Sequence, residues 1–164
     1  MNKAFFFIGL SGVGKTTLAN LFIDYLLKNT ELKPIFFDGN HMNDFNILKP
    51  ADGLDLESRF LRAKHLSSIV NWSIDLGYTP VVAVIGQPVS AMKYWRKHIK
   101  NYYEVYLEAD LKNCIERDFK SVYKSKKNVI GQDIKFEKPK NYDLKLDARE
   151  ASPEDLLEIL IESL

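Results

Sequence analysis

Short apolar runs alternate with longer amphipathic stretches along the 164-residue chain. Ala4–Ile8 is a continuous apolar run, which is typical of a strand buried on both faces of a sheet. From Leu18 to Leu26, apolar residues recur at i, i+3, i+4, i+7 and i+8, which predicts an amphipathic helix. Strands alternating with helices indicate an α/β fold, with a parallel sheet covered by helices on both faces. The same patterns predict further strands at 34–38, 80–85, 102–107 and 143–147, and helices at 56–76, 90–99, 110–119 and 152–164.

Composition and charge narrow the class of protein. With 46% apolar and 27% charged residues, the chain has an ordinary globular composition, which excludes a disordered or collagen-like protein. The net charge of +1 argues against a DNA-coating protein, although one local pocket can still bind a small anion. The single cysteine, Cys114, excludes an intramolecular disulfide and fits a reducing compartment. No stretch has the pattern of a membrane span or an export signal. We therefore expect one cytoplasmic domain over 1–164, without membrane or nucleic-acid partners.

Positive charge gathers in one segment of this nearly neutral chain. Residues 117–140 contain eight basic and three acidic residues, a net charge of +5, so the remainder of the chain carries −4. A lysine-rich stretch is usually a solvated surface. The alternative is a basic lid, at about 117–139, that closes over phosphates.

The segment 9–17, GLSGVGKTT, begins with a complete match to the phosphate-loop pattern G-x-x-x-x-G-K-S/T. It follows an apolar strand and opens a helix, the structural context that the pattern requires. Glycines let backbone N–H groups wrap the phosphates, and the positive end of the helix points at them. We expect Lys15 to reach the β- and γ-phosphates of ATP, and the Thr16 hydroxyl to bind Mg²⁺. The residues predicted to hold ATP here are Gly9, Ser11, Gly12, Val13, Gly14, Lys15, Thr16 and Thr17.

The other motifs in the sequence and the length of the chain indicate which class of P-loop protein this is. A GTPase would need N-K-x-D and D-x-x-G motifs, which do not occur in this sequence, and AAA-type or transport ATPases are longer. A small-molecule kinase with a three-layer P-loop fold remains. Asp38 ends the second strand, and ligands of parallel sheets bind outside the carboxyl ends of strands. It can accept a proton from an attacking hydroxyl or hold Mg²⁺ through water. Alternatively, Asp38 only caps the following turn.

Several stretches of the chain are similar to motifs of one kinase family. The loop 9–17 has that family's form, and 37–39, Phe-Asp-Gly, stands where the family has Leu-Asp-Gly-Asp-Asn. The stretch 103–124 is similar to the family's path from the fourth strand into the lid. Residues 131–139 follow its Phe-Thr-Gly-Ile-Asp-x-Pro-Tyr-Glu-x-Pro. Over nearly its whole length the chain therefore resembles the adenylylsulfate (APS) kinases.

The resemblance implies specific roles and a specific assembly. Asp38 would act as the base or as a metal partner beside Thr16, and Arg117 and Lys120 would close over ATP as part of the lid. The family's dimeric habit points to a homodimer, while the absence here of its N-terminal extension leaves the oligomeric state open.

The departures from the family concentrate where the acceptor binds. Leu54 and Val129 replace the two phenylalanines that sandwich the acceptor's adenine, and base–aromatic stacking is worth about 1–3 kcal/mol per base. Arg59 is retained, whereas Arg62 replaces an asparagine. Asn40, followed by His41, and Asn43 replace an acid and an arginine, and the segment 85–89 around Gln87 lacks another arginine. The residues predicted to contact the acceptor are Asp38, Asn40, His41, Asn43, Leu54, Arg59, Arg62, Gln87, Val129 and Ile130.

The donor half therefore resembles the family while the acceptor half differs. The first hypothesis is a kinase for a small anionic nucleotide-type acceptor other than APS, because Arg59 and Arg62 suit an anion and Gln87 suits a smaller base. The cytidine diphosphoramidate kinases of capsule modification, a branch that resembles APS kinases, phosphorylate a ribose hydroxyl of such a nucleotide. The alternatives are an orthodox APS kinase of sulfate assimilation, a kinase for another nucleotide-like or sugar hydroxyl, and a non-catalytic ATP-binding sensor. A nucleic-acid end kinase is disfavoured because no broad basic channel is evident.

Overall fold

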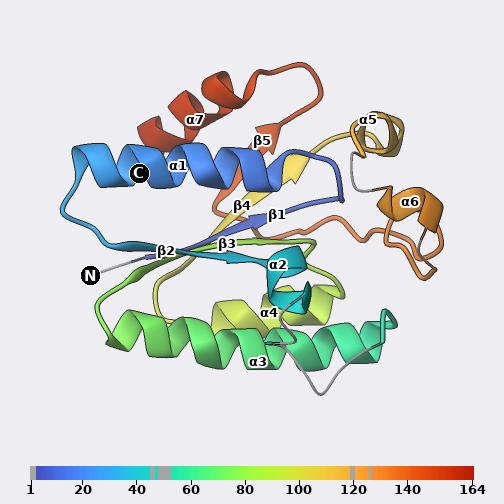
Figure 1. Cartoon of the computed structure of the whole chain (residues 1–164), viewed down its shortest axis with the longest axis horizontal. Helices are drawn as coiled ribbons and strands as arrows, with labels where there is room; N and C mark the ends of the chain where they lie inside the picture. The colour runs from blue at the N-terminus through green and yellow to red at the C-terminus, as the bar shows by residue number, and fades with distance from the viewer. Residues whose placement is uncertain (1–2, 45–46, 48–52, 119–120, 126) are drawn as a thin grey trace.

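The computed structural model describes residues 3–44, 47, 53–118, 121–125 and 127–164. Strands and helices alternate within these residues (Figure 1). The elements are β1 (Ala4–Ile8), α1 (Lys15–Asn29), β2 (Pro34–Asp38), α2 (Gly39–Asp44), α3 (Leu56–Asp75), β3 (Thr79–Val84), α4 (Val89–His98), β4 (Tyr102–Glu108), α5 (Leu111–Glu116), α6 (Val122–Ser125), β5 (Leu144–Asp147) and α7 (Pro153–Glu162). None of the helices in this described part is long and apolar enough to cross a membrane.

The five strands form one parallel sheet in the order β2-β3-β1-β4-β5. The central strand β1 pairs on both sides, with Phe6 opposite Val82 of β3 and Glu104 of β4. Helices α1 and α7 cover one face of the sheet, and α3 and α4 cover the other (Figure 1). This arrangement confirms the predicted three-layer α/β fold.

Alternate side chains of β1 supply two separate cores, one on each face of the sheet. Phe5 and Phe7 point toward α1, where Phe5 meets Phe22 edge to face with ring centroids 4.8 Å apart. Phe6 points the other way and meets Trp95 of α4, with centroids 5.0 Å apart. Because both faces of β1 are buried, the end of this strand is a rigid base for the loop that follows it.

Two short helices, α2 and α6, lie where the sequence predicted no helix, and α5 is shorter than the predicted 110–119. The six residues of α2 and the four of α6 are too few to produce a helical period in the hydrophobic pattern. Both helices stand beside the carboxyl ends of the strands (Figure 1), so they contribute to the surroundings of the loop after β1.

Candidate active site

The loop between β1 and α1 is shaped by glycines in left-handed backbone conformations. Gly12 has a φ of +80° and Gly14 a φ of +104°, which glycine adopts without steric cost. A Cβ atom on Gly12 would lie 2.3 Å from the carbonyl oxygen of Cys114, so the loop packs directly on the backbone of α5. Cys114 is fully buried, and burial raises the pKa of its thiol. This packing fixes the loop in the form that phosphate binding by backbone N–H groups requires.

Most of the predicted phosphate-binding residues face one cleft, and two lie behind the loop. Those that line the cleft are Ser11, Gly12, Gly14, Lys15, Thr16 and Thr17. Behind the loop, Val13 is buried in the core, and a Cβ atom on Gly9 would lie 2.6 Å from the carbonyl oxygen of Leu107. The Nζ of Lys15 donates to the carbonyl of Leu10 at 2.6 Å. That contact holds the ammonium group at the loop, beside the positive N-terminal end of α1.

The carboxylate of Asp38 uses both of its oxygens. Its Oδ1 accepts hydrogen bonds from the backbone N–H groups of Asn40, at 2.8 Å, and His41, at 3.2 Å, and so caps the start of α2. Its Oδ2 accepts from the hydroxyl of Thr16 at 2.7 Å, which joins the end of β2 to the start of α1. The side chain is 7% exposed. One carboxylate therefore both caps the following turn and lies beside the predicted metal ligand.

Thr16 lines the cleft, and its hydroxyl is hydrogen-bonded to the buried carboxylate of Asp38, which is itself absent from the lining. Mg²⁺ prefers oxygen ligands, and it usually takes only one or two from the protein together with water and nucleotide phosphates. In the ranges that the structure describes, no group of three or more His, Cys, Asp or Glu side chains is suited to a metal ion. The pair fits Mg²⁺ bound together with a nucleotide.

A single cleft joins the P-loop to the opposite wall formed by α3 and α4. Its floor contains the buried Trp95, whose Nε1 donates to the carbonyl of Ala63 at 2.8 Å. Beyond the P-loop, the lining consists of Gly39, Asn40, Leu54, Arg59, Arg62, Ala63, Leu66, Ala83, Val84, Ile85, Gly86, Gln87, Trp95, Arg117 and Asp118. Most of the predicted nucleotide residues and half of the predicted acceptor residues therefore line one cleft.

Two guanidinium groups one turn apart on α3 face this cleft. Nε of Arg59 donates to the carbonyl of Leu54 at 2.7 Å, and its NH2 group donates to the carbonyl of Asn128 at 3.2 Å. NH1 of Arg62 donates to the carbonyl of Gly53 at 2.6 Å. Burial, followed by the neighbouring Arg62 charge, lowers the pKa of Arg59. Two like charges this close favour a bound anion between them.

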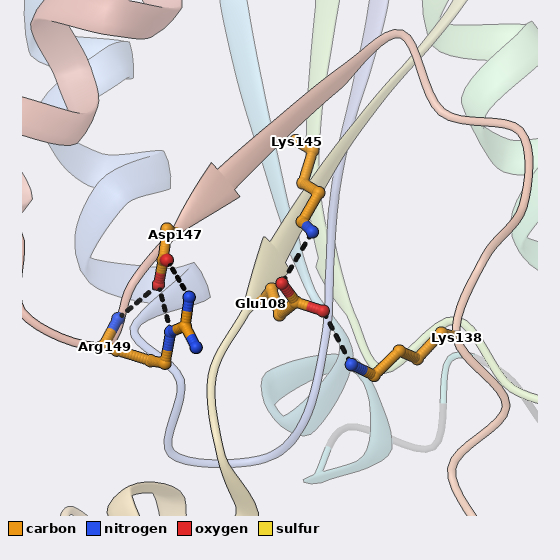
Figure 2. A network of polar contacts seen from close by, with 5 residues as sticks. All are labelled: Glu108, Lys138, Lys145, Asp147 and Arg149. Carbon is orange, nitrogen blue, oxygen red and sulfur yellow. Dashed lines mark hydrogen bonds and ion pairs between the residues drawn. The ribbon is translucent and has the colours of Figure 1, made fainter.

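The end of the predicted lid contacts the loop after β3 and the end of β4. The side-chain amide of Gln87 donates to the carbonyl of Glu137 at 2.7 Å and accepts from its N–H at 3.4 Å. Figure 2 shows the Glu108 carboxylate, at the end of β4, between Lys138 and Lys145, at 2.7 and 2.6 Å. Hydrogen bonds from these two lysines lower the pKa of Glu108. Gln87 therefore lines the cleft and also binds the backbone of Glu137, in the predicted lid.

Arg117 is exposed at the root of the predicted lid and lines the cleft. Its NH1 and NH2 groups donate to the carbonyls of Ala148 and Arg149, both at 3.1 Å. These contacts place the guanidinium beside the connection from β5 to α7, on the P-loop side of the sheet.

A model of the adenylylsulphate kinase family matches residues 1–147 of the chain. The chain belongs to the adenylylsulphate kinase family. It is 34% identical over 137 residues to the cytidine diphosphoramidate kinase of Campylobacter jejuni, covering 80% of this chain and 78% of that protein. Over 158 residues it is 28% identical to a probable adenylyl-sulfate kinase of Pyrococcus abyssi, covering 93% and 89%.

The solved structures agree with this assignment. The APS kinase of Mycobacterium tuberculosis, solved in complex with AMPPNP and APS, superposes with a TM-score of 0.86 at 26% identity, covering 99% of this chain and 96% of that one. The protein is therefore an ATP-dependent kinase of the adenylylsulphate kinase type, a phosphotransferase that acts on a hydroxyl group.

Some residues predicted to bind ligands in this kinase do not line the cleft. Val129 and Ile130 are buried in the core, where Gly131 approaches Leu10 so closely that an added Cβ atom would lie 2.8 Å from it. The structure thus brings Leu54 to the cleft, but not the two lid residues predicted beside it. His41 is exposed on α2 and is absent from the lining. The side chain of Asn43 and the whole of Lys120 lie outside the described residues.

Tyr123 was part of the sequence resemblance but was assigned no role. It comes from α6, is buried, and its hydroxyl donates to the carbonyl of Ser11 in the P-loop at 2.9 Å. The two residues are separated by 112 positions, so no local sequence pattern predicts their contact. The sequence offers one signal, a tyrosine within the basic segment 117–140, because a tyrosine that becomes buried needs a hydrogen-bond partner for its hydroxyl.

Proposed function

We propose that this kinase transfers the γ-phosphoryl group of ATP to the ribose 3'-hydroxyl of a cytidine nucleotide, with cytidine diphosphoramidate as the acceptor. The observation that carries the proposal is the composition of the acceptor wall. Leu54 lines the cleft where the family resemblance has a phenylalanine, and Arg62 adds a second guanidinium beside Arg59. An acceptor with a smaller base and a charged diphosphate-type group suits this wall better than APS.

The similarity to the Campylobacter jejuni cytidine diphosphoramidate kinase supports the same acceptor. The aromatic sandwich of the APS kinases depends on two rings. Here one position is Leu54, and the other, Val129, is buried away from the cleft. Because stacking of a base on an aromatic ring contributes about 1–3 kcal/mol, an adenine acceptor would lose much of its binding energy at this wall. The corresponding biological role would be capsule polysaccharide modification.

The proposed reaction is a direct in-line transfer. The bond from the γ-phosphorus to the bridging oxygen breaks while the acceptor oxygen bonds to phosphorus, and ADP leaves. Asp38 Oδ2 takes the hydroxyl proton or orients the hydroxyl, because a carboxylate oxygen that accepts from Thr16 has a further lone pair. Lys15 and the loop N–H groups stabilise the negative charge on the transferred group. Thr16 and, through water, Asp38 would hold Mg²⁺, which would further neutralise the charge of the phosphates.

The basic segment 117–139 is proposed to act as the lid over ATP, with Arg117 and Lys120 as its phosphate-facing cations. Closure excludes water, so the γ-phosphoryl group reaches the acceptor and is not lost to hydrolysis. The contacts of Glu137 with Gln87 and of Lys138 with Glu108 support a lid whose far end stays fixed on the sheet.

An orthodox APS kinase is the second candidate, because Arg59 is retained and the Mycobacterium tuberculosis APS kinase is similar over 99% of this chain. The two are separated by a competition experiment. The kinase is supplied with ATP, APS and cytidine diphosphoramidate in equal amounts, and the products are assigned by phosphorus NMR.

A new phosphomonoester on the cytidine nucleotide is the expected result. A Lys15→Ala protein serves as the negative control, because it lacks the lysine proposed to bind the phosphates of ATP. Phosphorylation of APS alone would replace the proposal with the second candidate. ATP binding without phosphorylation of either nucleotide would contradict both candidates and indicate a different hydroxyl acceptor.

A further inference from the structure

Tyr123 connects the root of the lid to the P-loop. Its ring is 5% exposed and packs in the same core cluster as Val13 and Leu10, on the α1 side of the sheet. Its hydroxyl donates a hydrogen bond to the Ser11 carbonyl at 2.9 Å. Burial raises the pKa of Tyr123 well above the ordinary value of 10, so the hydroxyl remains a neutral donor at physiological pH.

The contact acts on a peptide group that faces the cleft. The Ser11 carbonyl and the Gly12 N–H belong to one planar trans peptide, so they point in opposite directions. A hydrogen bond that holds the carbonyl toward Tyr123 therefore directs the Gly12 N–H away from it. Ser11 and Gly12 both line the cleft, and the Cα of Gly12 is fixed from behind by the Cys114 carbonyl.

A residue that lines the cleft holds the backbone of Tyr123 in place. The backbone N–H of Tyr123 donates to Oδ2 of Asp118 at 2.9 Å, and Asp118 lines the cleft beside Arg117. The start of α6 is thus bound to Asp118, which follows Arg117, a residue proposed to contact ATP. A continuous path of two hydrogen bonds runs from this carboxylate through Tyr123 to the loop.

We propose that Tyr123 is a positioning residue for the nucleotide, whose hydroxyl orients the Ser11–Gly12 peptide so that the Gly12 N–H binds a phosphate oxygen of ATP. The inference rests on nucleotide binding by the P-loop, and it does not depend on which acceptor the kinase uses. In this proposal, α6 helps to shape the ATP-binding loop, in addition to being part of the lid that closes over ATP.

The test compares Tyr123→Phe with Tyr103→Phe in the full chain. Each change removes one phenol oxygen and keeps the ring. The Tyr103 hydroxyl lies 3.2 Å from Ser163 Oγ, on residues that do not line the cleft, so the second variant is a matched control. The measurements are the Kd for MgADP by calorimetry, the KM values for ATP and acceptor, and the Gly12 amide resonance by NMR.

For Tyr123→Phe we expect MgADP binding and the KM for ATP to weaken by about 3- to 10-fold, the usual effect of losing one hydrogen bond. The KM for the acceptor stays at the parent value, and the Gly12 amide resonance of the nucleotide-free protein shifts. Tyr103→Phe changes none of these. An unchanged Kd and an unchanged Gly12 resonance would overturn the inference, even if the variant unfolds at a lower temperature. If the parent itself did not bind MgADP, the proposed function would fail, and the Gly12 resonance would still decide the orienting role.

Discussion

The two sides of the cleft are built in different ways. The nucleotide side comes from one continuous segment, 9–17, whose shape depends on backbone: left-handed glycines, a close approach to the Cys114 carbonyl, and the N-terminal end of α1. The proposed acceptor side comes from side chains of α3 and of the segments before α3 and after β3, with Arg59, Leu54 and Gln87 among them. A backbone-built site changes little when side chains change, whereas a site built from side chains can be altered one residue at a time. This difference explains how one family can keep ATP and exchange its acceptor.

Asp38 accepts hydrogen bonds from Thr16 and from the backbone N–H of Asn40, which both line the cleft, and replacing it has the largest expected effect. Asparagine is as good a helix cap as aspartate, so Asp38→Asn keeps α2 and the fold. The loss of the base lowers kcat by about 10²- to 10⁴-fold, as for other general bases. Steady-state kinetics are expected to show a smaller change in the KM for ATP. Asp75→Asn, at the exposed end of α3, is the control, and a near-parental kcat for Asp38→Asn would remove Asp38 from the chemical step.

Gly12→Ala tests whether the nucleotide side depends on backbone approach. The added methyl group would lie 2.3 Å from the Cys114 carbonyl, so the loop must move away from α5. We expect ATP binding to weaken by about 10- to 100-fold, from the usual cost of overpacking. Gly77→Ala is the matched control, since Gly77 has a φ of +86° but open space around it. Calorimetric binding of MgADP to Gly12→Ala with parental affinity would show that the close packing is not needed.

Arg62→Gln tests the side-chain character of the acceptor side. Removing one charged hydrogen-bond donor raises the KM for the acceptor by about 10-fold, while the KM for ATP keeps its parental value. Lys64→Gln removes a cation from the exposed face of the same helix and serves as the control. An equal rise in both KM values would mean that Arg62 supports the whole cleft and does not select the acceptor.

The smallest expected effect lies outside the cleft, at Glu108. Its pKa is lowered in the folded state, so its contribution to stability is present above the ordinary value of 4.5 and is lost as the pH falls through the folded-state pKa. Glu108→Gln removes the contacts with Lys138 and Lys145, and the free energy of unfolding falls by about 1 kcal/mol or less at neutral pH. Thermal unfolding at neutral and acidic pH is the measurement. A difference between the two proteins that persisted in acid would contradict the ion-pair explanation.

What the sequence predicted correctly follows local rules. The apolar run of β1, the glycines after it and the period of α1 each depend on residues close in the chain, and together they place the P-loop. Parallel strands bring their carboxyl ends to one edge of the sheet, so the sequence predicts Thr16 and Asp38 as two oxygen ligands of one metal ion. It does not predict the hydrogen bond between them.

What the sequence could not provide depends on contacts between distant residues. Gln87 was predicted to contact the acceptor, but its amide is bound to the backbone of Glu137, 50 positions away. The family resemblance predicts Val129 at the cleft, but its side chain is buried in the core. Nearby, Gly131 packs closely against Leu10. A motif fixes the order of residues along the chain, whereas the side of the segment that faces the ligand is decided by packing.

The most direct test of this account is the ratio of kcat/KM for cytidine diphosphoramidate to kcat/KM for APS, measured separately at saturating ATP. This ratio is the quantity that defines the preference of an enzyme for one substrate over another. We predict that it exceeds about 10, the lower range expected from the loss of aromatic stacking. A ratio at or below unity would contradict the account, because the acceptor wall would then select APS despite Leu54 and Arg62.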